Sequence, residues 1–143
     1  MANFALLDDQ NIVTNIVVVD DTEIANDMDL AGEEFCKNLF KVSNCKQYSE
    51  EGSFRKRPAN IGGTYDPIKD IFIRVKPYPS WILSSDDEWE APITHPSIET
   101  YGDPATSYRI KWNETDQRWE AADRSDPIKN FIWDTVSLTW SEV

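Results

Sequence analysis

The alternation of apolar and polar residues at the start of the chain predicts a β-hairpin. Residues 4–7 form a short apolar stretch, and residues 12–19 form a β-branched strand that returns after a four-residue polar turn. A turn of this length places Leu7 opposite Ile12. Because residues 16–19 are continuously apolar, we expect the second strand to be buried on both faces and to lie at the centre of the sheet.

One helix is expected over residues 32–40, after an acidic segment that is expected to be a solvated loop. Its apolar side chains recur at helical spacing and are expected to pack on the N-terminal strands, with a partner groove as the alternative: Phe35, Cys36, Leu39 and Phe40. Glu33 and Lys37 fall on the polar face as an i,i+4 pair. Residues 42–48 predict a further strand.

A short aromatic pattern recurs through the second half of the chain. Aromatic residues stand seven positions apart around a polar centre in three places: Tyr65 and Phe72, Trp112 and Trp119, Trp133 and Trp140. A four-residue hairpin loop would place the two members of each pair directly opposite each other on one face of a β-ribbon. A shorter loop would pair Leu83 with Trp89. We therefore predict Trp hairpins over residues 81–92, 109–121 and 131–142.

Two interpretations of the hairpin tryptophans remain open. Trp112, Trp119, Trp133 and Trp140 can form the core of a small β module, or some can be exposed as stacking platforms for sugar rings or as anchors of a protein interface. The last hairpin lies close to the end of the sequence, where segments fray unless they are docked. This position favours a docking role for Trp133 and Trp140.

Proline-rich connectors join the hairpins. Residues 76–81, with Tyr78 and Trp81, and residues 91–96 are expected to be extended spacers, because proline fixes φ and removes a backbone donor. Packed linkers and Pro–aromatic ligands for another domain are the two interpretations. The pattern as a whole predicts an α+β, mostly β fold. An N-terminal hairpin and sheet with one short helix (residues 1–75) precede a Pro-linked series of aromatic-pinned β-hairpins (residues 76–143).

The net charge of −12 is unevenly placed along the sequence. Residues 1–36 hold nine acidic residues and no Lys or Arg, residues 37–76 carry a net +5, and residues 77–143 carry a net −8. A field of this sign repels nucleic acid and anionic lipid, so neither is an expected partner. The basic triplet Arg55, Lys56 and Arg57 is a candidate partner-binding feature, with a solvated face and a phosphate site as alternatives.

Residue types that carry catalysis or bind metals are sparse. The single histidine, His95, lies in a connector, and no second His or Cys is spaced to complete a metal site or a nucleophilic triad. Cys36 and Cys45 are expected to be small buried groups, with a structural disulfide as the less favoured alternative. We expect neither enzymatic activity nor a cofactor. The sequence shows no secretory signal at its start and no apolar run of about 20 residues, so synthesis in a cytosol without a membrane anchor is expected.

Several blocks of residues 1–92 resemble small virion-associated proteins of marine tailed phages, especially cyanophages. The order and spacing of the blocks carry the resemblance: residues 4–19, 35–40, 54–62, 64–73 and 76–92. The resemblance implies a phage virion structural or accessory protein, such as a capsid decoration or a head–tail or tail accessory, made in the host cytoplasm and located in the virion. Its partners would be capsid or tail proteins and further copies of itself. Two alternatives remain: a carbohydrate-binding or host-adhesion module using exposed Trp, and a non-virion phage protein that binds a host protein.

Overall fold

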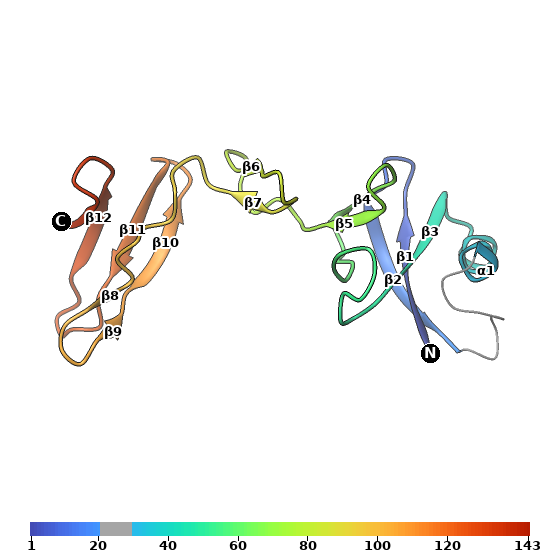
Figure 1. The fold of residues 1–143 in the computed structure, drawn as a ribbon, viewed down its shortest axis with the longest axis horizontal. Coiled ribbons are helices and arrows are strands. Elements are labelled where there is room, and N and C mark those ends of the chain that lie inside the picture. Colours follow the sequence, from blue (N-terminus) through green and yellow to red (C-terminus); the bar gives the residue numbers. More distant parts are fainter. Residues whose placement is uncertain (21–29) are drawn as a thin grey trace. The chain divides into compact units, whose positions relative to one another are not determined.

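The computed structural model describes residues 1–20 and 30–143, which divide into two units (Figure 1). The N-terminal unit spans Met1–Lys76 and the C-terminal unit spans Pro77–Val143, one residue beyond the expected boundary. Short antiparallel sheets and one helix make up the fold, which confirms the predicted α+β, mostly β class. The acidic segment predicted to be a loop lies mainly outside the described residues.

A three-stranded antiparallel sheet forms the centre of the N-terminal unit. Its strands are β1 (Ala2–Leu7), β2 (Val13–Val19) and β3 (Asn44–Tyr48), arranged in the order β2-β1-β3. Helix α1 (Leu30–Phe40) lies on one side of this sheet, and the hairpin of β4 (Thr64–Asp66) and β5 (Ile71–Ile73) lies on the other (Figure 1). The sheet therefore has apolar contacts on both faces.

Each face of the sheet has its own apolar core. The helix side contains Ala2, Phe4, Leu6, Val19, Cys36 and Cys45. The hairpin side contains Ala5, Leu7, Val13, Tyr48, Ala59, Tyr65 and Phe72. Successive residues of β1 alternate between these two cores, as side chains of a strand must. The core positions of β1 are almost completely buried, which identifies it as the central strand.

Two predictions about the first hairpin are wrong. The strand over residues 13–19 is an edge strand, and Ile16 and Val18 expose 39% and 59% of their surface. A continuous apolar run does not distinguish a central strand from an edge strand with an open face, so the run at residues 16–19 does not determine the position of the strand in the sheet. The predicted register is also shifted, because an irregularity after Leu6 pairs Leu7 with Val13 instead of Ile12.

The helix forms where it was predicted and packs on the strands through Cys36 and Phe35. Its inward face is rotated from the predicted one, because Leu39 and Phe40 are exposed and Glu33 is buried. Glu33 lies three positions before Cys36 and so shares its side of the helix. The Glu33 carboxylate is directed to Lys46 and Arg55 instead of Lys37.

Adjacent glycines attach the second hairpin to the first. Gly62 has a φ of +88°, and a Cβ on Gly63 would lie 2.6 Å from the carbonyl oxygen of Ile73. This close passage allows Gly63 and Gly62 to exchange backbone hydrogen bonds of 2.8 Å with Val13. Gly62 thus supplies a positive φ, and Gly63 allows a close backbone approach that leaves no room for a side chain.

A four-stranded antiparallel sheet is the largest sheet of the C-terminal unit, in the order β10-β11-β12-β13. Its strands are β10 (Arg109–Asn113), β11 (Arg118–Ala122), β12 (Asn130–Asp134) and β13 (Thr139–Glu142). Figure 1 labels its first three strands side by side. Two short hairpins precede it: β6 (Ile82–Leu83) with β7 (Trp89–Glu90), and β8 (Thr100–Tyr101) with β9 (Thr106–Ser107). The predicted cross-strand pairs are confirmed at Trp112–Trp119, Trp133–Trp140, Tyr65–Phe72 and Leu83–Trp89.

The aromatic hairpins of both units share one turn design. An Asp or Asn side chain follows the first aromatic residue and accepts from loop amides, as Asp66 does from Ile68 and Lys69. The last loop residue takes a positive φ, at +54° for Asp70, +48° for Gln117 and +55° for Leu138. This left-handed residue closes the loop in register with the twist of the strands. The polar centre seen in the sequence is therefore what fixes the aromatic pairing.

Candidate functional sites

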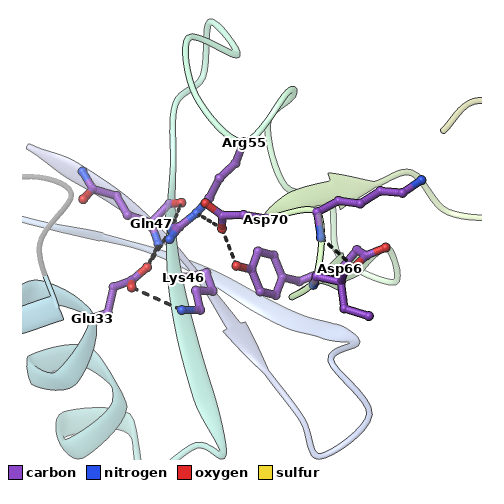
Figure 2. A network of polar contacts seen from close by, with 9 residues as sticks. Glu33, Lys46, Gln47, Arg55, Asp66 and Asp70 are labelled. Carbon is purple, nitrogen blue, oxygen red and sulfur yellow. Dashed lines mark hydrogen bonds and ion pairs between the residues drawn. The ribbon is translucent and has the colours of Figure 1, made fainter. Parts of the chain in front are cut away.

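The N-terminal unit contains a buried network of charged groups around Glu33 (Figure 2). The Glu33 carboxylate lies 2.7 Å from Arg55 Nη1 and 3.5 Å from Lys46 Nζ, and it accepts the backbone N–H of Gln47 at 2.8 Å. Arg55 in turn donates to the Gln47 carbonyl at 2.8 Å and to Asp70 at 2.8 Å. We call this set the Glu33–Arg55 network. It connects α1, β3 and the end of the β4–β5 loop.

Tyr65 extends the network into the core on the hairpin side. Its hydroxyl donates a short hydrogen bond to Asp70, and the Arg55 guanidinium lies 5.7 Å from the centre of its ring. Burial raises the pKa of the Tyr65 hydroxyl, and the bond to Asp70 adds to the rise. Partial burial would raise the pKa of Asp70, but the hydrogen bonds from Tyr65 and Arg55 outweigh it and lower that pKa. The acid stays ionised and the phenol stays protonated, which suits a structural role.

The network places the three residues of the basic triplet in different surroundings. Arg55 is held in the network, Lys56 is exposed, and Arg57 is buried with 5% of its surface accessible. Burial would lower the pKa of Arg55, yet the hydrogen bond and charge of Glu33 raise it. Arg55 is therefore a permanently charged partner of a buried carboxylate, and the triplet does not present one continuous basic surface.

The two edges of the N-terminal sheet differ because of this network. On β3, Glu33 accepts the Gln47 N–H and Arg55 donates to the Gln47 carbonyl, so side chains occupy the outer edge. On β2, residues 62–65 pair only with the start of the strand, near Val13. Beyond Val13, no strand in the described part of the chain pairs with the outer side of β2. We call the exposed side of β2, with Ile16 and Val18, the open edge.

In the C-terminal unit, the candidate aromatic residues come together in one cluster. Trp112, Trp119 and Trp133 are buried on one face of the β10–β13 sheet, and Trp140, Tyr78 and Trp81 pack against them. Ring pairs meet edge to face, with centroids 5.2 Å apart for Trp112–Trp119 and 5.0 Å apart for Trp133–Trp140. The hairpin tryptophans are therefore mainly a core, and Trp133 is buried within the chain itself.

Both proline-rich connectors pack on this aromatic face. Trp119 Nε1 donates to the Ile93 carbonyl at 2.9 Å, and Trp140 Nε1 donates to the Ile98 carbonyl at 2.8 Å. Glu114 accepts from Trp112 Nε1 at 2.8 Å and from the Ser80 hydroxyl at 2.8 Å. Trp119 thus fixes the connector of residues 91–96, Trp140 fixes the segment just after it, and Glu114 joins the connector of residues 76–81 to Trp112, which favours packed linkers over free peptide ligands.

One pocket of the C-terminal unit opens beside the connector of residues 91–96. Its volume is about 380 Å³, and Trp81, Trp89 and Trp119 supply its aromatic walls. Glu90, Thr94 and His95 supply polar groups at its rim, which are exposed to solvent. We call it the aromatic pocket. Trp81 and Trp119 were predicted as partner-binding residues, whereas the other residues of the pocket were not.

The opposite face of the β10–β13 sheet carries charged residues that are paired. Arg118 lies 2.8 Å from Glu120, and Arg109 donates to the Asp123 carbonyl at 2.8 Å. Hydrogen bonds from Asn113 and Arg118 lower the pKa of Glu120, so this carboxylate neutralises its neighbours throughout the neutral range. This face therefore adds no strong positive field to a unit of net charge −8.

The two cysteines are free thiols buried in the helix-side core. Burial raises the pKa of both Cys36 and Cys45, which makes them poor nucleophiles at neutral pH. Within residues 1–20 and 30–143, no cluster of three or more His, Cys, Asp or Glu side chains could hold a metal ion. Among the described residues, no helix has both the length and the hydrophobicity that crossing a membrane requires.

Sequence reasoning missed Glu33, Asp70 and the polar rim of the aromatic pocket. A signal for Glu33 exists, because a carboxylate three positions before Cys36 on the inward helix face needs a cationic partner. No local signal marks Glu90 or Thr94, since their pocket is formed by strands and connectors that pack together only in the folded unit. No family model, curated protein or solved structure matches the chain.

Proposed function

We propose that the protein is a non-enzymatic accessory protein of a phage particle, which binds a capsid or tail protein through the open edge of its N-terminal sheet. The observation that carries the proposal is the contrast between the two sheet edges. Glu33 and Arg55 occupy the backbone groups of Gln47 on β3. Beyond Val13, no described strand pairs with the outer side of β2, where Ile16 and Val18 are exposed and the Ile16 N–H donates only to the Asn15 side chain of its own strand.

An unprotected edge is the feature that strand addition uses. Isolated proteins protect their sheet edges with Lys, Pro, short strands or covering segments. The seven-residue strand β2 contains neither Lys nor Pro, and its exposed residues are two polar ones, Thr14 and Asn15, followed by the apolar Ile16 and Val18. A strand of a particle protein can therefore add to β2 through main-chain hydrogen bonds, with Ile16 and Val18 giving side-chain selectivity.

Two further features support the proposal that the protein is part of a phage particle. The resemblance of residues 1–92 to virion-associated phage proteins points to this setting, and the separation of charge along the chain suits contacts between neighbouring copies. Catalytic groups are not needed for this role. The ionised groups with shifted pKa values lie in the Glu33–Arg55 network, in turns and on β11, where they bond to the chain itself.

Quantitative mass spectrometry of purified particles tests the proposal. We expect peptides of this chain in particles, at a copy number that matches a repeating capsid or tail subunit or a neck component. Peptides found only in infected-cell lysate would contradict it and would favour an early phage protein that binds a host protein.

A further inference from the structure

The aromatic pocket has the size and walls of a small-ligand site. Its volume of about 380 Å³ falls within the range of pockets that enclose such ligands. Trp119 is fixed there by its hydrogen bond to the Ile93 carbonyl, and Trp81 meets it edge to face with centroids 6.1 Å apart. The His95 ring lies 4.8 Å from the Trp119 ring. The walls are therefore preformed, which reduces the entropy lost on binding.

The rim of the pocket offers hydrogen-bonding groups that the fold does not use. In the part of the chain that the structure describes, the side chains of Glu90 and Thr94 make neither a hydrogen bond nor an ion pair, and both residues are exposed. His95 uses Nδ1 toward the Pro96 carbonyl and Glu99, and no described residue bonds to its Nε2. The residues that line the pocket thus include a carboxylate, a hydroxyl and an imidazole together with three tryptophans.

A buried donor without a partner lies in the same wall. The indole N–H of Trp81 is buried and has no acceptor among the described residues. Buried polar groups almost always find a partner, so such an exception needs a local reason. The N–H is shielded from solvent, so it is a local cost of packing Trp81 into this wall and is not a contact for a ligand in the pocket.

From these features we infer that the aromatic pocket binds a neutral saccharide. A pyranose ring presents C–H groups that pack on indole faces and hydroxyl groups that bond to side chains such as Glu90, Thr94 and His95. The C-terminal unit carries thirteen acidic and five basic residues, and no cation among the described residues forms an ion pair with Glu90. Uronic or sulfated sugars are therefore repelled, and neutral sugars are selected.

A quaternary ammonium group is the competing ligand, since aromatic cages with a carboxylate bind such cations. Two observations favour the saccharide. Trp81 and Trp119 contact each other directly, whereas the walls of a cage stand apart around the cation. A quaternary ammonium also lacks donors, so it would leave Glu90, Thr94 and His95 without hydrogen-bond partners.

This inference is independent of docking at the open edge, because the pocket and β2 belong to different units. Isothermal titration calorimetry of the full chain with maltotriose, cellotriose and chitotriose tests it, with choline and trigalacturonate as comparison probes. We expect at least one neutral trisaccharide to bind at one site with a Kd of about 1 mM or tighter. Glu90→Gln and Thr94→Val should each weaken that binding, and together by about tenfold or more.

Matched controls in the same unit are Glu142→Gln and Thr135→Val, which change exposed residues outside the pocket and should leave affinity unchanged. Intrinsic Trp fluorescence confirms that every variant is folded. The inference is overturned if no trisaccharide binds, if choline binds in their place, or if the double Glu90/Thr94 variant binds as tightly as the parent chain.

Discussion

Trp112 lies directly opposite Trp119 across the β10–β11 hairpin, with ring centroids 5.2 Å apart and ring planes at 68°. Trp119 also touches Trp81 and donates to Ile93 in the connector. One cross-strand pair thus links a hairpin to the segment that covers it. The stability of the C-terminal unit should therefore depend unequally on its tryptophans.

Replacing Trp119 with Ala should destabilise the C-terminal unit by about 3–5 kcal/mol, because it removes a buried aromatic side chain and leaves the Ile93 carbonyl without its donor. Trp140→Ala should cost less than Trp119→Ala, because Trp140 is only half-buried. The lost contact between aromatic rings should contribute about 1 kcal/mol of that cost, in addition to the loss of burial. Urea unfolding followed by the remaining Trp fluorescence measures both. Equal losses from the two changes would show that the cluster is not organised around Trp119.

Leu138 offers a gain in stability. This residue closes the last hairpin with a φ of +55°, a conformation that strains a side chain but not glycine. Leu138→Gly should raise the stability of the C-terminal unit by about 0.5–1 kcal/mol. Val136→Gly, at an exposed position of the same loop, should lower it slightly. A loss of stability in the Leu138 variant would mean that its side chain matters more than its backbone.

Arg55 and Lys56 are neighbours in sequence, but their replacement should change the stability of the N-terminal unit by very different amounts. Arg55→Ala leaves the buried Glu33 carboxylate without its closest cation and should destabilise the N-terminal unit by about 3 kcal/mol or more. Lys56→Ala, at an exposed position, should change stability by less than about 0.5 kcal/mol. All six Trp lie in the C-terminal unit, so unfolding of the N-terminal unit should be followed through Tyr signals and thiol accessibility. Similar effects of both changes would contradict the network.

Acid should weaken the N-terminal unit through Asp70. Its folded pKa lies below its usual value, so the folded state favours the ionised form. The resulting stability is present above the unfolded pKa of about 4 and is lost as the pH falls through the lower folded pKa. Asp70 is half exposed, so the contribution should stay below about 1 kcal/mol. Asp70→Asn should remove this part of the acid dependence in pH-dependent urea unfolding, and an unchanged profile would refute the assignment.

The buried thiols provide a separate probe of the same unit. Because burial raises the pKa of Cys36 and Cys45, both should react slowly with a disulfide reagent at pH 8 in the native protein and rapidly in urea. The rate should increase in Arg55→Ala and remain unchanged in Trp119→Ala, which affects the other unit. Fast labelling of the native parent chain would show that the helix-side core opens readily.

The aromatic pairs could be predicted from sequence because their causes are local. A loop of four residues with an Asx side chain and a left-handed last residue determines which residues face each other, so Trp112 and Trp119 could be paired by counting. The same count fails at the first hairpin, where an irregularity after Leu6 pairs Leu7 with Val13, so the local turn sets the register only where the strands are regular.

Strand position and helix orientation depended on distant residues. Residues 16–19 have the composition of a central strand, yet β1 takes that place because both α1 and the β4–β5 hairpin cover it. Glu33 can be buried because Lys46 and Arg55, which lie much later in the sequence, form ion pairs with its carboxylate. The aromatic pocket likewise requires the connector to lie on Trp119, which no spacing in the sequence reveals.

Docking of the N-terminal unit is tested most directly by co-sedimentation of the purified full chain with particles that lack it. The parent chain should sediment with the particles. Val18→Lys on the open edge should remain in the supernatant, while Leu39→Lys, at a helix position of similar exposure (57% against 59%), should still sediment. Binding that survives Val18→Lys, or a parent chain that stays in the supernatant, would contradict docking through β2.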